Sequence, residues 1–327
     1  MRAWQVQHHG EPGDVLHLVE TDEPVPGSGE VRVRVAAAAV GLPDALMCRG
    51  SYAFDPPLPF VPGQEVCGVV DAVGDGVDLA VGSRVMGVTC FYDGRGGFAE
   101  QTVLAAANAF RVPEEMSAVD AASFRIGFST AWTALVRRGG LSVGEDLVVL
   151  GAAGGSGQAA VQLGRALGAR VIAVGAGPRK REVCRELGAE VVIDRKVDSV
   201  PEGVLEATDG RGADVVFDPV GGEFAASVLR GLGAGGRFLA VGFASGEWVD
   251  VDTRDLVWRN QSLVGVLASG ASRADEEVDH EALLALVADG ALTSLTEVVP
   301  FVDVPDAVER VAAGSVVGKL AVELTAS

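Results

Sequence analysis

A glycine cluster that follows a run of branched apolar residues carries the strongest chemical signal in the chain. Leu147–Leu150 is typical of a buried strand, and the small residues 151–157 lead into a helix. Gly154 lets the backbone approach an anion, Gly157 lets helix and strand pack closely, and the helix N-terminus adds N–H groups and a positive dipole end. Ala152 replaces the usual first glycine, which gives A-x-G-x-x-G. We predict that the pyrophosphate of a dinucleotide binds Ala153, Gly154, Gly155, Ser156 and Gly157.

The end of the next strand indicates which dinucleotide is favoured. An NAD site normally has a carboxylate there for the ribose hydroxyls. This chain has Gly175, followed by the cations Arg179, Lys180 and Arg181. Arg179 and Lys180 could bind a 2′-phosphate, which favours NADPH. The alternative is a solvated basic start to a helix over 181–187.

Composition limits the class of protein. A chain of 327 residues with 48% hydrophobic content predicts two domains with sizeable cores. The net charge of −19 argues against a nucleic-acid partner. The four cysteines are far apart and predict neither disulfides nor a zinc knuckle. Without a signal-peptide core or a long apolar run, we expect a cytoplasmic protein with no membrane contact.

The pattern along the chain changes near residue 120. The first part has short alternating strands and dense turn residues, which predict a mainly antiparallel β domain over 1–124. Residues 125–267 alternate strands and helices, which predicts a doubly wound parallel sheet of the Rossmann type, an α/β fold. We expect the tail, 268–327, to complete the first domain.

Several stretches in this order resemble the medium-chain dehydrogenase/reductase superfamily, and within it the zinc-free quinone oxidoreductases. The resemblance covers nearly the whole chain and implies a GroES-like catalytic domain, a Rossmann NADPH-binding domain and an active site in the cleft between them. It rests on residues 26–35, 60–65, 96–100, 130–132, 151–157 and 218–222.

The positions that bind catalytic zinc in alcohol dehydrogenases of this superfamily hold other residues here. Gly41, Gln64 and Ile126 occupy the three ligand positions, and Pro43 occupies that of the proton-relay Ser/Thr. Zinc needs several N, S or O ligands in tight geometry, so we expect no metal. Asp44 and Glu65 are then interpreted as ion-paired structural carboxylates.

Without a Lewis acid, reduction of an electrophilic acceptor is more feasible than oxidation of an unactivated alcohol. The resemblance therefore implies an NADPH:quinone oxidoreductase-type enzyme that transfers a hydride to quinones or related carbonyl and enone acceptors. Tyr52 matches a tyrosine near the substrate in several relatives and is the candidate for orienting or protonating the acceptor. The alternative is a surface loop tyrosine.

Further cofactor contacts follow from the resemblance alone. Thr130 is expected at the start of a helix that faces the nicotinamide ribose, and Lys319 is expected to reach the cofactor from the tail. Arg195 suits a 2′-phosphate, but could equally be an exposed loop arginine. Two strand ends are expected to pass the nicotinamide: Gly242, Phe243 and Ala244, and Val266 and Leu267.

Two other functions stay open at this point. Relatives in the superfamily reduce enoyl thioesters, and others serve as cofactor-binding proteins with a structural or sensing role. Arg49, Arg95 and Arg125 neither support nor exclude a pocket for a thioester's phosphates. The apolar strand 262–267 predicts a homodimer, because an uncovered apolar edge favours pairing across a two-fold axis.

Overall fold

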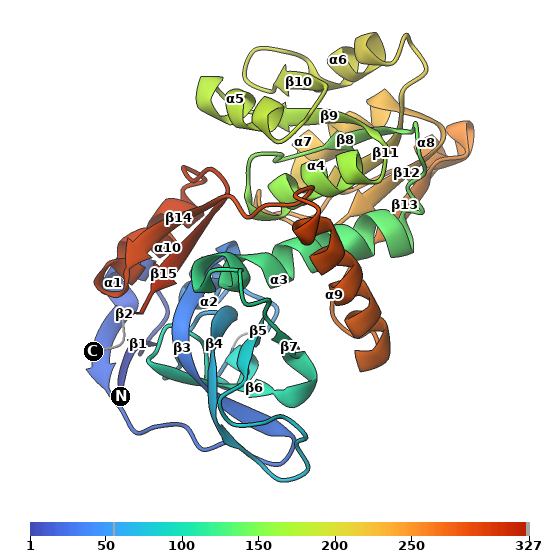
Figure 1. The fold of residues 1–327 in the computed structure, drawn as a ribbon. Coiled ribbons are helices and arrows are strands. Elements are labelled where there is room, and N and C mark those ends of the chain that lie inside the picture. Colours follow the sequence, from blue (N-terminus) through green and yellow to red (C-terminus); the bar gives the residue numbers. More distant parts are fainter. Residues whose placement is uncertain (55, 325–327) are drawn as a thin grey trace. The chain divides into compact units, whose positions relative to one another are not determined.

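The computed structural model describes residues 1–54 and 56–324 (Figure 1). Contacts within the chain divide it into two compact units. The first unit joins Met1–Ile126 to the segment from Ser294 onward, and the second is Gly127–Thr293. Among the described residues, no helix has both the length and the apolar character that a membrane crossing requires.

The first unit is built on a mainly antiparallel sheet around the long strand β3 (Glu30–Val40). β3 alternates buried Val31, Val33 and Val35 with more exposed charged residues, so that one face covers the core. The sheet order is β14-β15-β3-β4-β5-β7, β6 also pairs with β3, and β1 pairs with β2. The other strands are β1 (Arg2–Val6), β2 (Leu16–Glu20), β4 (Glu65–Val73), β5 (Arg84–Val88), β6 (Gln101–Ala105), β7 (Ala109–Arg111), β14 (Thr296–Pro300) and β15 (Lys319–Glu323), and the helices are α1 (Pro12–Val15), α2 (Leu42–Cys48) and α10 (Val304–Ala312).

The second unit holds a six-stranded sheet in which every neighbouring pair is parallel. Its order is β10-β9-β8-β11-β12-β13, the 3-2-1-4-5-6 order of the doubly wound nucleotide-binding fold. The strands are β8 (Asp146–Val149), β9 (Arg170–Gly175), β10 (Val191–Asp194), β11 (Ala213–Asp218), β12 (Leu232–Ala240) and β13 (Ser262–Gly265), and the helices are α4 (Gly155–Ala166), α5 (Pro178–Glu186), α6 (Val200–Ala207), α7 (Gly222–Val228), α8 (Thr253–Arg259) and α9 (Arg273–Ala288). The predicted α/β fold class, a doubly wound parallel sheet with a mainly antiparallel β domain, is confirmed.

One segment lies in a different unit from the one that the sequence suggests. Residues 268–293, which the sequence assigns to the first domain, belong to the second unit. The physical reason lies on α9, where the Asp279 carboxylate accepts a hydrogen bond from Trp132 Nε1 at 2.8 Å and one from Arg137 Nε at 2.6 Å.

Helix α3 (Ala118–Trp132) continues into a π-helical segment, Thr133–Arg138. Another helix begins earlier than the sequence pattern indicates. Helix α5 begins at Pro178 rather than at Arg181. Gly177 adopts a φ of +81°, and proline suits the first helical position because its φ is already fixed. Arg179 and Lys180 therefore lie in the first turn of α5.

Candidate active site

The glycine loop joins the end of β8 to the start of α4 in the second unit. A Cβ atom on Gly157 would lie 2.2 Å from the Gly151 carbonyl oxygen, so only glycine permits this close packing. Gly154 is the N-cap of α4 and has an extended backbone. The first N–H groups of a helix have no acceptor within it, and here they can serve an anion. The loop fits the pyrophosphate of a dinucleotide.

Three cations gather beyond the ends of β9 and β10. Lys180 lies on the first turn of α5, and Arg195 and Lys196 follow β10. Burial, and then the positive charges of Arg195 and Lys196, lower the pKa of Lys180. The Arg195 backbone N–H donates to the Gly175 carbonyl at 3.0 Å, which joins this corner to the end of β9. The cluster of Lys180, Arg195 and Lys196 is called the cation cluster below.

Arg179 is oriented toward other groups. Its Nη1 lies 2.9 Å from Glu182 Oε2, and the side chain is 63% exposed. Glu186 adds a second carboxylate at 3.8 Å. The structure thus brings Lys180 and Arg195 together, while Arg179 is part of an exposed ion-pair network on α5.

The predicted nicotinamide contacts at two strand ends lie next to each other, because β12 and β13 are paired. Val266 N donates to the Ala240 carbonyl at 3.0 Å, and the Phe243 ring stacks on Trp248 with centroids 4.6 Å apart. Thr130 differs from expectation in its position. It lies near the C-terminal end of α3, not at the start of a helix, because α3 begins at Ala118.

A buried charged cluster occupies the first unit. Asp44 on α2, Glu65 at the start of β4 and Lys319 at the start of β15 are 1%, 4% and 8% exposed. Lys319 Nζ forms an ion pair with Glu65 Oε1, and the Ile126 N–H donates to Glu65 Oε2 at 2.7 Å. The three side chains are called the buried triad below. The structure places Lys319 against Glu65, and its predicted cofactor contact stays a prediction.

Asp44 is held by backbone donors rather than by a cation alone. Gly41 N donates to Oδ2 at 2.8 Å and Gly63 N to Oδ1 at 2.9 Å. Burial nevertheless raises the pKa of Asp44 to about 7, with a smaller upward contribution from Glu65, against the lowering effects of these N–H groups and of Lys319. Asp44 therefore carries only part of its charge near neutral pH.

Tyr52 lies close to Asp44 and Gln64. The phenol ring packs edge-on against Phe54, with centroids 6.0 Å apart, and against Phe91 at 6.5 Å. Burial raises the pKa of Tyr52, Gln64 lowers it, and the charge of Asp44 raises it further. A half-buried phenol of this kind stays protonated at neutral pH and can donate its proton.

Two residues of interest escaped the sequence analysis. Lys196 directly follows Arg195 in the sequence, and that adjacency was the available signal. Gln64 was noted only as a residue that is not a metal ligand. Its nearness to Tyr52 depends on the fold, because no spacing rule links positions 52 and 64.

Comparison with known proteins gives the family. Residues 27–114 match the model of the alcohol dehydrogenase GroES-like domain, and residues 155–286 match that of the zinc-binding dehydrogenase. The chain is 36% identical over 259 residues to the quinone oxidoreductase-like protein 2 homolog of Nematostella vectensis, which covers 79% of this chain and 70% of that protein. The chain belongs to the medium-chain dehydrogenase/reductase superfamily.

Two further proteins are similar to this one over nearly the whole chain. A mycobacterial protein solved in complex with NADPH superposes with a TM-score of 0.91 at 28% identity, over 99% of this chain and 100% of that one. A phenolphthiocerol/phthiocerol polyketide synthase of Mycobacterium tuberculosis is 32% identical over 337 residues, which is 96% of this chain and 14% of that protein. This medium-chain protein is an oxidoreductase of that superfamily.

The zinc ion that one family description implies does not fit the residues of this site. Gly41, Gln64 and Ile126 supply no thiolate or imidazole ligand. In addition, the Lys319 ammonium already neutralises Glu65. A dication beside this ammonium would be repelled by it.

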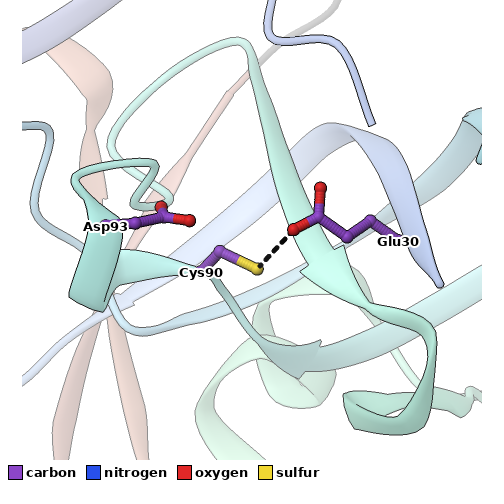
Figure 2. A group of neighbouring side chains, drawn as sticks. All are labelled: Glu30, Cys90 and Asp93. Carbon is purple, nitrogen blue, oxygen red and sulfur yellow. Dashed lines mark hydrogen bonds between the residues drawn. The ribbon is translucent and has the colours of Figure 1, made fainter. Parts of the chain in front are cut away.

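A second group of potential ligands lies elsewhere in the first unit. Figure 2 shows Glu30, Cys90 and Asp93, whose ligand atoms lie within 4.8 Å of one another. Arg95 forms ion pairs with both carboxylates, Glu30 and Asp93. Burial raises the pKa of the Cys90 thiol, which donates to Glu30 Oε1 at 3.8 Å. Arg95 already offsets one of the two negative charges and occupies both carboxylates, and the group is interpreted as structural.

Proposed function

We propose that this protein is an NADPH-dependent, zinc-independent reductase of quinones or related electrophilic carbonyl and enone acceptors. The observation that carries the proposal is the buried ion pair between Lys319 and Glu65. It neutralises a carboxylate at a site where zinc-dependent relatives would polarise an alcohol. An acceptor that is already electrophilic needs no such Lewis acid.

The nicotinamide supplies a hydride when it is bound. The chain has to bind the cofactor, orient the acceptor and protonate it. The glycine loop would hold the pyrophosphate through backbone N–H groups. The strand ends at Gly242–Ala244 and Val266–Leu267 would line the nicotinamide, with Thr130 near its ribose. Tyr52 would hydrogen-bond the acceptor oxygen and give it a proton once the hydride has been transferred.

The cation cluster supports NADPH over NADH. Lys180, Arg195 and Lys196 are three positive charges near the position where NAD sites place a carboxylate, and Gly175 offers no carboxylate to repel a 2′-phosphate. A phosphate would relieve the mutual repulsion that lowers the pKa of Lys180. The solved mycobacterial relative in complex with NADPH supports the same choice.

The test is oxidation of NADPH and NADH by the purified, chelator-treated protein with a panel of quinones, a simple enone and crotonyl-CoA. We expect NADPH oxidation with quinones that survives chelation, and a loss of about 100-fold or more in kcat for Tyr52→Phe. Loss of activity on chelation would contradict the zinc-independent mechanism. An unchanged Tyr52→Phe enzyme would remove Tyr52 from it.

A second function is reduction of enoyl thioesters. The similarity over 96% of the chain to a polyketide synthase favours it, because polyketide synthases build acyl chains held as thioesters. Turnover of crotonyl-CoA without turnover of quinones would select this function. Either outcome separates an enzyme from a cofactor-binding protein that has no turnover.

We also propose that the protein forms a homodimer through β13. This strand is at the edge of its sheet, and Leu263 and Leu267 are 41% and 68% exposed. An apolar edge strand favours pairing with a second copy. Light scattering with size-exclusion chromatography should give twice the chain mass of 33.5 kDa, and Leu263→Asp should give the monomer.

A further inference from the structure

Gln64 carries a buried polar atom that its surroundings do not explain. The residue is 8% exposed, and among the described residues its Nε2 atom has no hydrogen-bond partner. An unpaired buried N–H group destabilises a fold. Such a group in a native structure calls for an explanation, and a catalytic role or a bound water or ion is among those known.

The neighbouring carboxylates already have donors. Both oxygens of Asp44 accept backbone N–H groups, from Gly41 and Gly63. Glu65 accepts from the Ile126 N–H and from Lys319. The residues directly before and after Gln64 in the sequence, Gly63 and Glu65, are thus committed to these contacts.

The phenol of Tyr52 lies close to the Gln64 side chain. The carboxamide lies close enough to lower the pKa of Tyr52, yet no hydrogen bond of normal geometry joins the two side chains. A phenol oxygen is a modest acceptor, whereas a phenolate oxygen accepts a bond roughly twice as strong. A donor aimed at Tyr52 therefore gains most when the phenol has lost its proton.

We propose that Gln64 is the positioning residue for Tyr52, and that its Nε2–H group stabilises the phenolate that Tyr52 forms when it protonates the reduced acceptor. This inference rests on the proposed function. The acceptor gains a hydride from the nicotinamide, the O–H bond of Tyr52 breaks, and the proton moves to the acceptor oxygen. Water then returns a proton to the phenolate. The interaction strengthens only as the proton leaves, so it accelerates the step rather than the binding of the acceptor.

The other charges around Tyr52 explain why a neutral donor is useful there. The charge of Asp44 opposes a phenolate. Among the described residues of the first unit, Lys319 pairs with Glu65, Arg95 with Asp93 and Glu30, and Arg49 with Glu11. Phe91 and Phe54 add apolar surface. The Gln64 carboxamide is the group that lowers the pKa of Tyr52 in this setting.

The chain offers a direct measurement, because it has only two tyrosines, Tyr52 and Tyr92. Tyr92 is 51% exposed, and Tyr92→Phe leaves Tyr52 as the single tyrosine. Biosynthetic replacement by 3-fluorotyrosine then gives one fluorine signal, and it acidifies the phenol so that it titrates at a milder pH. Fluorine NMR against pH reports the titration midpoint of Tyr52 without any substrate.

In this background we compare Gln64→Met, which keeps the shape and removes the donor, with the control Gln101→Met. Gln101 donates to Asp71 Oδ2 at 2.9 Å in the same unit, outside the candidate site. Gln64→Met should raise the Tyr52 midpoint by about one pH unit and lower kcat about tenfold, with KM unchanged. Its Tm should stay equal or rise, because an unpaired buried donor is removed. Gln101→Met should change neither the midpoint nor kcat.

An unchanged Tyr52 midpoint in Gln64→Met would overturn the inference, whatever the kinetics. If Gln64→Met does not fold, Gln64→Asn withdraws the amide by one methylene and should shift the midpoint in the same direction by less. Full activity of Tyr52→Phe would remove this role of Gln64 but leave a reductase. Absence of turnover with every acceptor would contradict the proposed function, while the titration would still report the Gln64–Tyr52 contact.

Discussion

The two units build their polar sites in opposite ways. In the second unit, residues 151–157 form the glycine loop from one continuous stretch, and backbone N–H groups do the binding. In the first unit, the buried triad joins side chains far apart in sequence, and Lys319 and Glu65 are separated by 254 positions. A site made of local backbone can be predicted from spacing, whereas a site made of distant side chains becomes visible only after folding.

The two sites also differ in what holds them. The glycine loop depends on the absence of side chains, because a single Cβ at Gly157 would collide with the backbone. The buried triad depends on charge, because removing a carboxylate or an ammonium from water is costly unless it is paired. Changes in the second unit should therefore appear in cofactor binding, and changes in the first unit should appear in stability and its pH dependence.

The largest effect is expected for Gly157→Ala. The added Cβ would lie 2.2 Å from the Gly151 carbonyl oxygen and 2.9 Å from Ala152 Cα, both backbone atoms that cannot move without shifting the loop. Loss of two N–H bonds to phosphate should weaken NADPH binding about 100-fold or more, measured by fluorescence titration. Gly265→Ala is the control, because a Cβ there meets nothing within 4 Å. Normal NADPH binding by Gly157→Ala would mean that the loop is not the cofactor site.

Lys319→Met tests the buried triad. Breaking a buried ion pair leaves Glu65 uncompensated, which typically costs about 3–5 kcal/mol and should lower Tm by on the order of 10 °C. The double variant Lys319→Met/Glu65→Gln removes both charges and should recover much of this loss. As a control, Arg310→Met breaks the exposed pair with Glu297, worth about 0–1 kcal/mol. Equal losses for Lys319→Met and Arg310→Met would contradict the structural role of burial.

Asp44→Asn should change how stability depends on pH. Because the folded pKa of Asp44 is about 7, well above its unfolded value of about 4, folding favours the protonated form. Its contribution is fully present below about pH 4 and is lost as pH rises to about 7, by about 1.4 kcal/mol per pH unit at most. Denaturant unfolding between pH 4.5 and 7.5 should show a flatter profile for Asp44→Asn than for the wild type. Parallel profiles would mean that Asp44 is ionised throughout.

The sequence predicts the second unit better than the first, because the residues of the glycine loop are neighbours in the sequence. The run Leu147–Leu150 and the glycines after it predicted the strand, the loop and the helix. The position of Arg179 could not be predicted, because its pairing with Glu182 depends on where α5 begins, and Gly177 and Pro178 set that start. In the first unit, Lys319 was noticed but not its partner, since only the antiparallel pairing of β15 with β3 brings that strand into the sheet with β4.

The smallest effect is expected on the preference of the second unit for NADPH over NADH. Lys180→Ala/Arg195→Ala removes two members of the cation cluster, and we expect NADPH affinity to fall about 10- to 100-fold with NADH affinity unchanged, because only NADPH carries the 2′-phosphate. Arg179→Ala is the matched control. Its guanidinium is already engaged by Glu182 and largely exposed, so its effect should stay within about twofold. A larger loss for Arg179→Ala than for the double variant would transfer phosphate recognition to the exposed face of α5. A larger loss for the double variant would mean that the fold selects Lys180 over Arg179 for the phosphate. It does so by bringing Arg195, 15 positions further along the chain, next to Lys180. The sequence alone does not distinguish these two adjacent cations.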